Sequence, residues 1–365
     1  MTRAPAPTTL GQLDFKSNAI GFLRIALASI VVWSHSLLIT SGRDPGMAYS
    51  HNAFNSGLLA VGGFFVLSGF LITRSAESLQ NPSRFMWHRA LRIYPGFWAC
   101  LFVTAFVLAP IMYFIESGAL HGYLTSPDGP FSYIYRNALV FYRQTDIANL
   151  ITSGPSPKQI DAPLWTLPWE MACYIIVALF GLFAVYRRPL IVPIVTGLLL
   201  IGMLTMESAL RHAPIFEFSR ALFLFISFGA GSSAYFFRSR IPMRWSLVVA
   251  AAIVMAVALP TPFARSIAPI PLAYLTLYVS MFLPIRSFDR RVDLSYGLYI
   301  YSLPLQYILV MLGVQHYGFI LYWGSSMAIG LAFAAASWFL VERQALRFKN
   351  IRLARAVGSV ASCQK

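Results

Sequence analysis

An arginine and a histidine within one apolar run are the first candidates for chemistry. Arg24 and His35 lie eleven residues apart in RIALASIVVWSH. In a helix that spacing is about 20° beyond three turns with a rise of roughly 16 Å, so both side chains share one face. Ionisable groups are costly in lipid, which predicts a polar interior next to this face. The alternative is that Arg24 reaches the inner headgroups while His35 lies at the outer interface.

A basic segment that follows carries four more candidates. In RFMWHRALRIYP, residues 84–95, Arg84, His88 and Arg92 recur at helical spacing, and Arg89 stands beside them. Guanidinium groups bind phosphates through charge-assisted, often bidentate hydrogen bonds. The segment therefore predicts a phosphate-binding patch. An amphipathic segment resting on anionic lipid would have the same pattern, and that interpretation stays open.

A single carboxylate stands at the start of a later apolar run. Glu170 lies in PLWTLPWEMACY, which we place on the same side of the membrane as His35. A carboxylate can orient an imidazole and stabilise its charged form. The alternative is an acidic residue favoured by the helix dipole, with Trp165 and Trp169 in an interfacial aromatic belt.

The composition indicates that a membrane-embedded fold positions these residues. Of 365 residues, 58% are hydrophobic and 11% are charged, whereas soluble domains carry about 25% charged residues. The apolar residues cluster in runs near the length of about 20 that a helix needs to cross a bilayer. Lipid requires such runs to be helical. We predict an all-α polytopic membrane protein with about ten transmembrane helices, at 19–40, 57–74, 95–115, 170–186, 189–206, 221–237, 245–260, 268–284, 295–313 and 319–341.

The basic residues predict the orientation. With these spans, 20 of the 28 Lys and Arg residues fall on the side of the N-terminus and 7 on the opposite side, while Arg24 lies within the first span. Positive residues favour the cytoplasm, so both termini are expected there. The net charge of +15 is then mainly a topology signal with anionic lipid headgroups as its partner, and nucleic acid is not expected.

The chain divides into three parts under this topology. Residues 1–18 are expected to form a cytoplasmic N-terminal tail, 19–342 a transmembrane domain with an outer loop at 116–169, and 343–365 a basic cytoplasmic tail. The aromatic segment 131–142 is too short to cross and is expected to lie in the interface or re-enter. The glycine-rich run 61–73 favours close helix packing. Three cysteines without metal-site spacing predict neither a disulfide framework nor a metal centre.

Taken in order, these segments resemble the acyltransferase-3 family of bacterial integral-membrane O-acyltransferases, over roughly residues 15–345. The segments that carry the resemblance are FLRIALASIVVWSH, GFFVLSGFLIT, RALRIYP, LWTLPWE, SYGLYIYSLP and FLVER. The resemblance implies that Arg24 and His35 are an essential pair, that Arg89 and Arg92 bind the donor, and that Glu170 is the acidic residue of the outer motif. Many members have a histidine where this chain has Ser302, so no second catalytic histidine is expected.

The resemblance also implies a reaction. We expect acyl-CoA, with acetyl-CoA favoured, to enter from the cytoplasm of a bacterium whose inner membrane holds the protein. Arg89 and Arg92 would bind its phosphates, with Arg84 or His88 assisting. His35 would act as general base or carry the acyl group, oriented by Glu170. The acceptor would be a hydroxyl of a surface or lipid-linked glycan, and no permanently bound cofactor is expected.

One alternative is a transporter or exporter of a lipid-linked or small solute, because a substrate path would also use the same spans and intramembrane charges. Another is a non-catalytic membrane scaffold, in which Arg24 and His35 are dispensable. The acyl group, the acceptor and the oligomeric state are not readable from the sequence.

Overall fold

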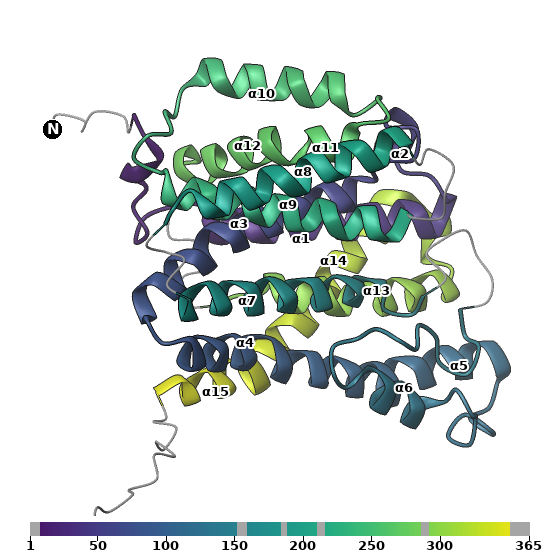
Figure 1. The fold of residues 1–365 in the computed structure, drawn as a ribbon. Helices are drawn as coiled ribbons and strands as arrows, with labels where there is room; N and C mark the ends of the chain where they lie inside the picture. Colours follow the sequence, from purple (N-terminus) through teal and green to yellow (C-terminus); the bar gives the residue numbers. More distant parts are fainter. Residues whose placement is uncertain (1–7, 152–158, 184–187, 210–215, 286–291, 351–365) are drawn as a thin grey trace, which may run out of the picture.

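The computed structural model describes residues 8–151, 159–183, 188–209, 216–285 and 292–350. Within these ranges the regular structure is helical, apart from a single bridge between Thr9 and Pro242. The long helices run side by side, and an irregular region with short helices covers one end of the bundle (Figure 1). The all-α prediction is therefore confirmed.

A helix occupies each of the ten predicted spans. In chain order the α-helices are α1 (Ile20–Ser41), α2 (Pro45–Tyr49), α3 (Ser56–Leu79), α4 (Pro82–Val103), α5 (Ala109–Ser117), α6 (Pro130–Asn137), α7 (Leu167–Leu182), α8 (Ile191–Ala209), α9 (Phe216–Phe236), α10 (Trp245–Ala258), α11 (Ala264–Ile267), α12 (Pro269–Phe282), α13 (Ser295–Met311), α14 (Phe319–Ser337) and α15 (Arg343–Leu346). Short 3-10 or π-helical turns, named η, lie at Leu10–Gln12 (η1), Thr104–Leu108 (η2), Ala162–Thr166 (η3), Val314–Tyr317 (η5), Trp338–Glu342 (η6) and Arg347–Asn350 (η7).

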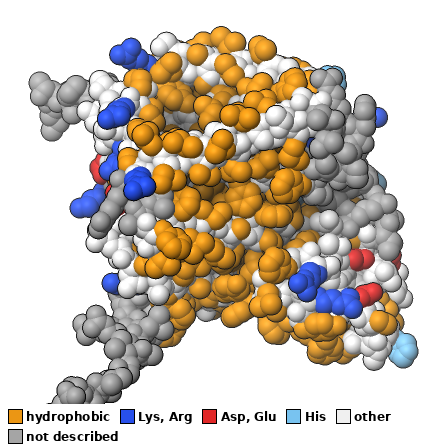
Figure 2. Space-filling model, in the orientation of Figure 1, with side chains coloured by type: hydrophobic (Ala, Val, Ile, Leu, Met, Phe, Trp, Pro, Cys, Tyr) orange, Lys and Arg blue, Asp and Glu red, His pale blue; other side chains and the backbone are white. Residues whose placement is uncertain are grey.

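Six helical stretches in the described part of the chain are long and apolar enough to cross a membrane. They are residues 20–41, 56–79, 82–117, 162–182, 191–208 and 319–349, and α10 and α12 are shorter apolar helices. Hydrophobic side chains cover most of the visible middle of the molecule, whereas many charged ones lie toward its edges (Figure 2). This distribution suits a body surrounded by lipid between two polar layers.

The helix that contains the third span begins well before the predicted start of that span. Instead of starting at residue 95, the helical stretch runs without a break from Pro82 to Ser117 through α4, η2 and α5. Asn81 begins it, because its side-chain oxygen accepts the backbone N–H of Arg84 at 2.9 Å, which satisfies a free donor of the first turn. The basic segment is therefore the first part of a long helix rather than a separate surface element.

The aromatic segment 131–142 forms only the two-turn helix α6 and the chain after it. Phe131 and Tyr135 are exposed on α6, and the Trp98 indole donates to the Ala138 carbonyl at 2.9 Å. The segment is too short to cross a bilayer, as predicted.

The core of the bundle depends on a close approach of α3 and α9, which make the most extensive helix contact in the structure. A Cβ at Gly69 would overlap the Phe228 carbonyl, and one at Gly231 would overlap the Val66 carbonyl. Only glycine lets two helix backbones come this close, so the predicted role of the glycine-rich run is confirmed at Gly69.

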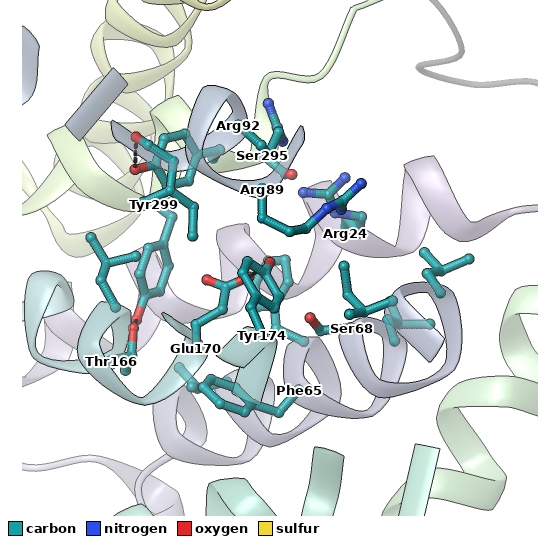
Figure 3. Close-up of a pocket in the computed structure, with 18 residues that line it drawn as sticks. Arg24, Phe65, Ser68, Arg89, Arg92, Thr166, Glu170, Tyr174, Ser295 and Tyr299 are labelled. Carbon is teal, nitrogen blue, oxygen red and sulfur yellow. Dashed lines mark hydrogen bonds between the residues drawn. The ribbon is translucent and has the colours of Figure 1, made fainter. Parts of the chain in front are cut away.

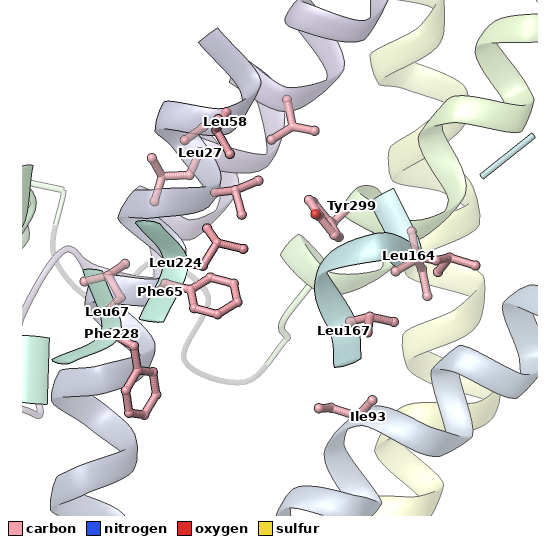
Figure 4. Close-up of a cluster of buried hydrophobic side chains, with 14 of the residues drawn as sticks. Leu27, Leu58, Phe65, Leu67, Ile93, Leu164, Leu167, Leu224, Phe228 and Tyr299 are labelled. Carbon is pink, nitrogen blue, oxygen red and sulfur yellow. The ribbon is translucent and has the colours of Figure 1, made fainter. Parts of the chain in front are cut away.

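Apolar side chains fill the space around this contact. Figure 4 shows side chains from α1, α3 and α9 on one side and from α4, η3, α7 and α13 on the other, and these belong to one buried cluster. Leu27 and Phe65 belong to the first group, and Ile93 and Leu164 to the second. The helices that carry the candidate site residues are thus held by shared packing.

We predict that Gly69→Ala and Gly231→Ala each lower the stability of the detergent-solubilised protein by about 1–3 kcal/mol, because the added methyl group forces α3 and α9 apart. Gly202→Ala is the matched control, since a Cβ at that position meets open space. The substitution also replaces glycine by a better helix former. Thermal unfolding measures the difference. Equal melting temperatures for the three variants would contradict the close-packing argument.

Candidate active site

A cavity of about 150 Å³ lies among α1, α3, α4, α7 and α13. Arg24, Arg89, Arg92 and Glu170 all line it, so the structure brings together four of the residues that the sequence singled out. The three arginines gather on one side, and Glu170 and Tyr174 face the same space from α7 (Figure 3). Several positive charges and one carboxylate thus share a small, largely apolar enclosure.

Asp293 holds two of the three arginines. Its Oδ2 atom accepts a hydrogen bond from Arg24 Nη1 at 2.5 Å and another from Arg92 Nη2. Ser295 Oγ donates to the second carboxylate oxygen at 2.6 Å. Asp293 lies in the segment before α13, so this one side chain ties α1, α4 and α13 together. Burial opposes ionisation of the Asp293 carboxyl. The charges of the Arg24 and Arg92 guanidiniums outweigh this effect and keep the pKa of Asp293 well below its usual range.

Glu342 supplies a second carboxylate to Arg92. Its Oε2 accepts from Arg92 Nη1 at 3.0 Å, and its Oε1 accepts from Ser337 Oγ at 3.0 Å. Glu342 ends the π-helical turn η6, and it can approach α4 because Gly96 leaves room for its side chain. Arg92 therefore forms ion pairs with two carboxylates on two different segments.

Arg89 is placed differently. Its Nε is buried with no hydrogen-bond partner among the described residues, and its Nη2 lies 3.5 Å from Ser75 Oγ. No carboxylate in the described ranges lies within ion-pair distance of it. A buried guanidinium with unused donors favours an anionic ligand. Arg89 is thus the cavity arginine best able to bind a phosphate.

Glu170 is grouped with the arginines rather than with His35. The Tyr174 hydroxyl, one helical turn further along α7, donates to Glu170 Oε1. The charge of Glu170 also acts on Arg89. Of the described residues, Tyr174 and not His35 is its hydrogen-bond partner, so the geometry differs from the predicted pairing of Glu170 with the imidazole.

The other two residues of the basic segment do not line the cavity. Arg84 is exposed at the start of α4. His88 places its Nε2 at 3.1 Å from the Lys349 carbonyl oxygen of η7. The prediction that one of them assists Arg89 and Arg92 therefore has no direct contact to support it.

His35 lies on the same helix as Arg24, toward the opposite end, and does not line the cavity. Its side chain is partly buried, and its Nδ1 is buried with no hydrogen-bond partner in the part of the chain that the structure describes. The charges of Asp44 and Arg220 act on it. The Arg220 charge also acts on Tyr299, which lines the cavity, so Arg220 lies near both the imidazole and the cavity wall.

Two features complete the surroundings of His35. Asp44 is buried after α1, where its carboxylate accepts from Ser34 Oγ at 2.7 Å and from the backbone N–H of Gly46 at 2.7 Å. The Arg220 guanidinium lies over the Trp165 ring at 4.3 Å. An aromatic surface and a cation beside a partly exposed imidazole suit a hydroxyl-bearing ligand.

Asp293, Asp44 and Tyr174 were missed by the sequence reasoning. One feature of the sequence could have identified Asp293 as a candidate. It is an acidic residue just before the motif SYGLYIYSLP. Asp44 opens the turn Asp-Pro-Gly, which reads as an ordinary helix cap. Ser302, the residue at the position of the family histidine, is buried on α13 near Gly330 of α14, and its hydroxyl finds no partner among the described residues. It does not line the cavity.

Comparisons with known proteins match most of the chain. The family model described as "Acyltransferase domain" matches residues 17–340. The chain is similar to an O-acetyl transferase of Shigella phage Sf6, with 27% identity over 93% of this chain and 98% of the relative. It is also similar to nodulation protein 10 of Rhizobium leguminosarum bv. viciae, with 27% identity over 93% of this chain and 95% of the relative. No solved structure matches it.

We predict that Asp293→Asn destabilises the protein by about 3 kcal/mol, because two partly buried guanidiniums lose the charge they share. Asp128→Asn is the matched control. It breaks the ion pair between Asp128, whose side chain is 59% exposed, and Arg136, whose side chain is 42% exposed. Such exposed pairs contribute at most about 1 kcal/mol to stability. Thermal unfolding in detergent compares the two, and equal losses would show that Asp293 does not hold the cluster.

Proposed function

Because this chain belongs to the acyltransferase family whose model matches residues 17–340, we propose that it transfers an acyl group, in the first place acetyl, from acyl-CoA to a glycan hydroxyl. The observation that carries the proposal is the buried cavity with Arg89 facing it and no ion-pair partner among the described residues. The name of the phage relative, "O-acetyl transferase", supports the acetyl group and the oxygen acceptor.

The donor enters from the cytoplasm in this proposal. The proposed topology has ten crossing helices with both termini in the cytoplasm of a bacterium, which places Arg89 and Arg92 at the cytoplasmic end of the cavity. Arg89 binds the diphosphate of the donor, because its buried Nε has no hydrogen-bond partner and no carboxylate pairs with it in the described structure. Arg92, already bonded to Asp293 and Glu342, keeps the neighbouring side chains in place. The slender pantetheine arm then follows the cavity past Arg24.

The acceptor approaches from the outer side in this proposal. Trp165, with Arg220 over its ring, offers a flat surface on which a sugar ring can stack, and His35 lies near that pair. The imidazole takes the proton of the acceptor hydroxyl while the oxygen attacks the thioester carbonyl carbon. The carbon–sulfur bond breaks, the new ester leaves on the acceptor, and the CoA thiolate receives a proton and departs.

Arg24 has a more restricted role than the resemblance implies. Its Nη1 is bonded to Asp293, yet the side chain still lines the cavity. In the proposed reaction it lowers the energy of negative charge on the donor as the thioester moves toward His35. Glu170, bonded by Tyr174, limits the net positive charge of the cavity rather than orienting the imidazole.

We predict that Arg89→Gln weakens binding of acetyl-CoA to the purified protein about tenfold or more, the effect of losing a charge-assisted hydrogen bond worth about 1.5–3 kcal/mol. Arg84→Gln is the matched control on the same helix, since that side chain is exposed, and it should change the affinity by less than about twofold. Calorimetric titration measures both. Equal affinities for the two variants would remove Arg89 from the donor site.

We predict that His35→Gln lowers the release of free CoA from acetyl-CoA and a glycan acceptor by about a hundredfold or more, the usual contribution of a general base. His121→Gln, in the outer loop, should leave the rate unchanged. A thiol reagent follows CoA release in proteoliposomes. Solute flux across the vesicle membrane without any CoA release would instead establish the transporter alternative.

A further inference from the structure

The last described turn of the chain folds back onto the basic helix. The turn η7 follows α15, which lies beside the start of α4 (Figure 1). The Trp87 indole donates to the Phe348 carbonyl at 3.1 Å, and His88 Nε2 lies 3.1 Å from the Lys349 carbonyl. A carbonyl only accepts, so this nitrogen of His88 carries the hydrogen. Two consecutive side chains of α4 thereby fix the backbone of two consecutive residues of η7.

This attachment holds the backbone of Lys349 against the residue that precedes Arg89. His88 directly precedes Arg89 in the chain, and the Lys349 charge acts on Arg89 and on Arg92. Lys349 is partly buried, and no carboxylate of the described ranges forms an ion pair with it. Like charges held together without an anion are unfavourable. The arrangement is stabilised when a multiply charged anion lies between Lys349 and Arg89.

We infer that Lys349 binds the 3′-phosphate of the CoA nucleotide, with Trp87 and His88 as residues that position it. The inference rests on the proposed function, because it requires acyl-CoA as the donor. Arg89 lines the cavity and Lys349 does not, so a donor whose pantetheine arm fills the cavity meets Arg89 with its diphosphate. The nucleotide part of the donor stays outside the cavity, near the start of α4, where Trp87 and His88 hold η7. The 3′-phosphate is the remaining charged group there, and an ammonium binds it as a point charge.

The test compares CoA with 3′-dephospho-CoA, which differs only in lacking that phosphate. Both are titrated against the full-length protein in detergent. The wild-type protein should bind CoA about tenfold more tightly, and Lys349→Gln should abolish that preference by weakening CoA alone, since tenfold corresponds to about 1.4 kcal/mol. Arg89→Gln should weaken both ligands. Arg347→Gln, an exposed arginine of the same turn, is the matched control and should keep the preference.

A second variant tests the positioning role without changing charge. Trp87→Phe keeps an aromatic ring but removes the indole donor to Phe348, so it should reduce the preference for CoA while leaving 3′-dephospho-CoA binding as it is. A merely structural effect would change the affinity for both ligands alike. This readout holds even if Lys349→Gln proves unstable.

The outcomes separate the inference from the proposal beneath it. If the wild-type protein binds neither ligand, the proposed function fails. If it binds both equally, or if Lys349→Gln weakens both alike, the donor proposal stands and the role of Lys349 is overturned. The role is also overturned if Lys349→Gln leaves CoA binding intact but abolishes binding of phosphatidylglycerol, because the lysine would then serve a lipid headgroup.

Discussion

The structure depends on keeping arginines ionised inside a body surrounded by lipid. A guanidinium does not lose its proton in such a setting, so it must find carboxylates or stay at the surface. Asp293 provides one carboxylate for both Arg24 and Arg92, and Glu342 provides another for Arg92. These bonds join α1, α4, α13 and the π-helical turn η6. Arg89 lies outside these bonds, and its buried Nε has no hydrogen-bond partner among the described residues, so the cluster is a structural junction that leaves one guanidinium without a carboxylate in the described ranges.

The two ends of the first helix are therefore suited to different chemistry. Near its start, Arg24 lines a cavity together with Arg89 and Arg92, and guanidinium groups suit the phosphates of the proposed donor. Toward its other end, the partly buried His35 is acted on by the charges of Asp44 and of Arg220, whose guanidinium lies over Trp165. The rise of roughly 16 Å between the two positions is comparable to an extended pantetheine arm. In the reaction proposed above, a thin donor arm that bridges the two regions lets a cytoplasmic thioester meet an acceptor on the other side of the membrane.

Most helices could be predicted from local sequence, and the failures have identifiable causes. The apolar runs give nearly the observed limits because lipid permits little besides helices there. The helix of the third span extends to Pro82, before the predicted start at residue 95, and this added stretch contains Arg84, Arg89 and Arg92. The local sequence does not reveal that Asp293 and Glu342, about 200 and 250 residues away, bond to Arg92. The attachment of His88 to Lys349 was missed for the same reason, since nothing local relates the two segments.

The sequence by itself determined the helical class, the face shared by Arg24 and His35, and the family, because hydrophobic length, helical periodicity and motif order are all local properties. Only the tertiary structure decided which charges meet. The position of Glu170 along the chain predicts a partner for His35. In the structure, Glu170 instead lies with Tyr174 and the cavity arginines. Pairing between charges depends on distances of a few ångströms across helices, and those distances follow from packing contacts such as Gly69 against Phe228, which no single segment contains.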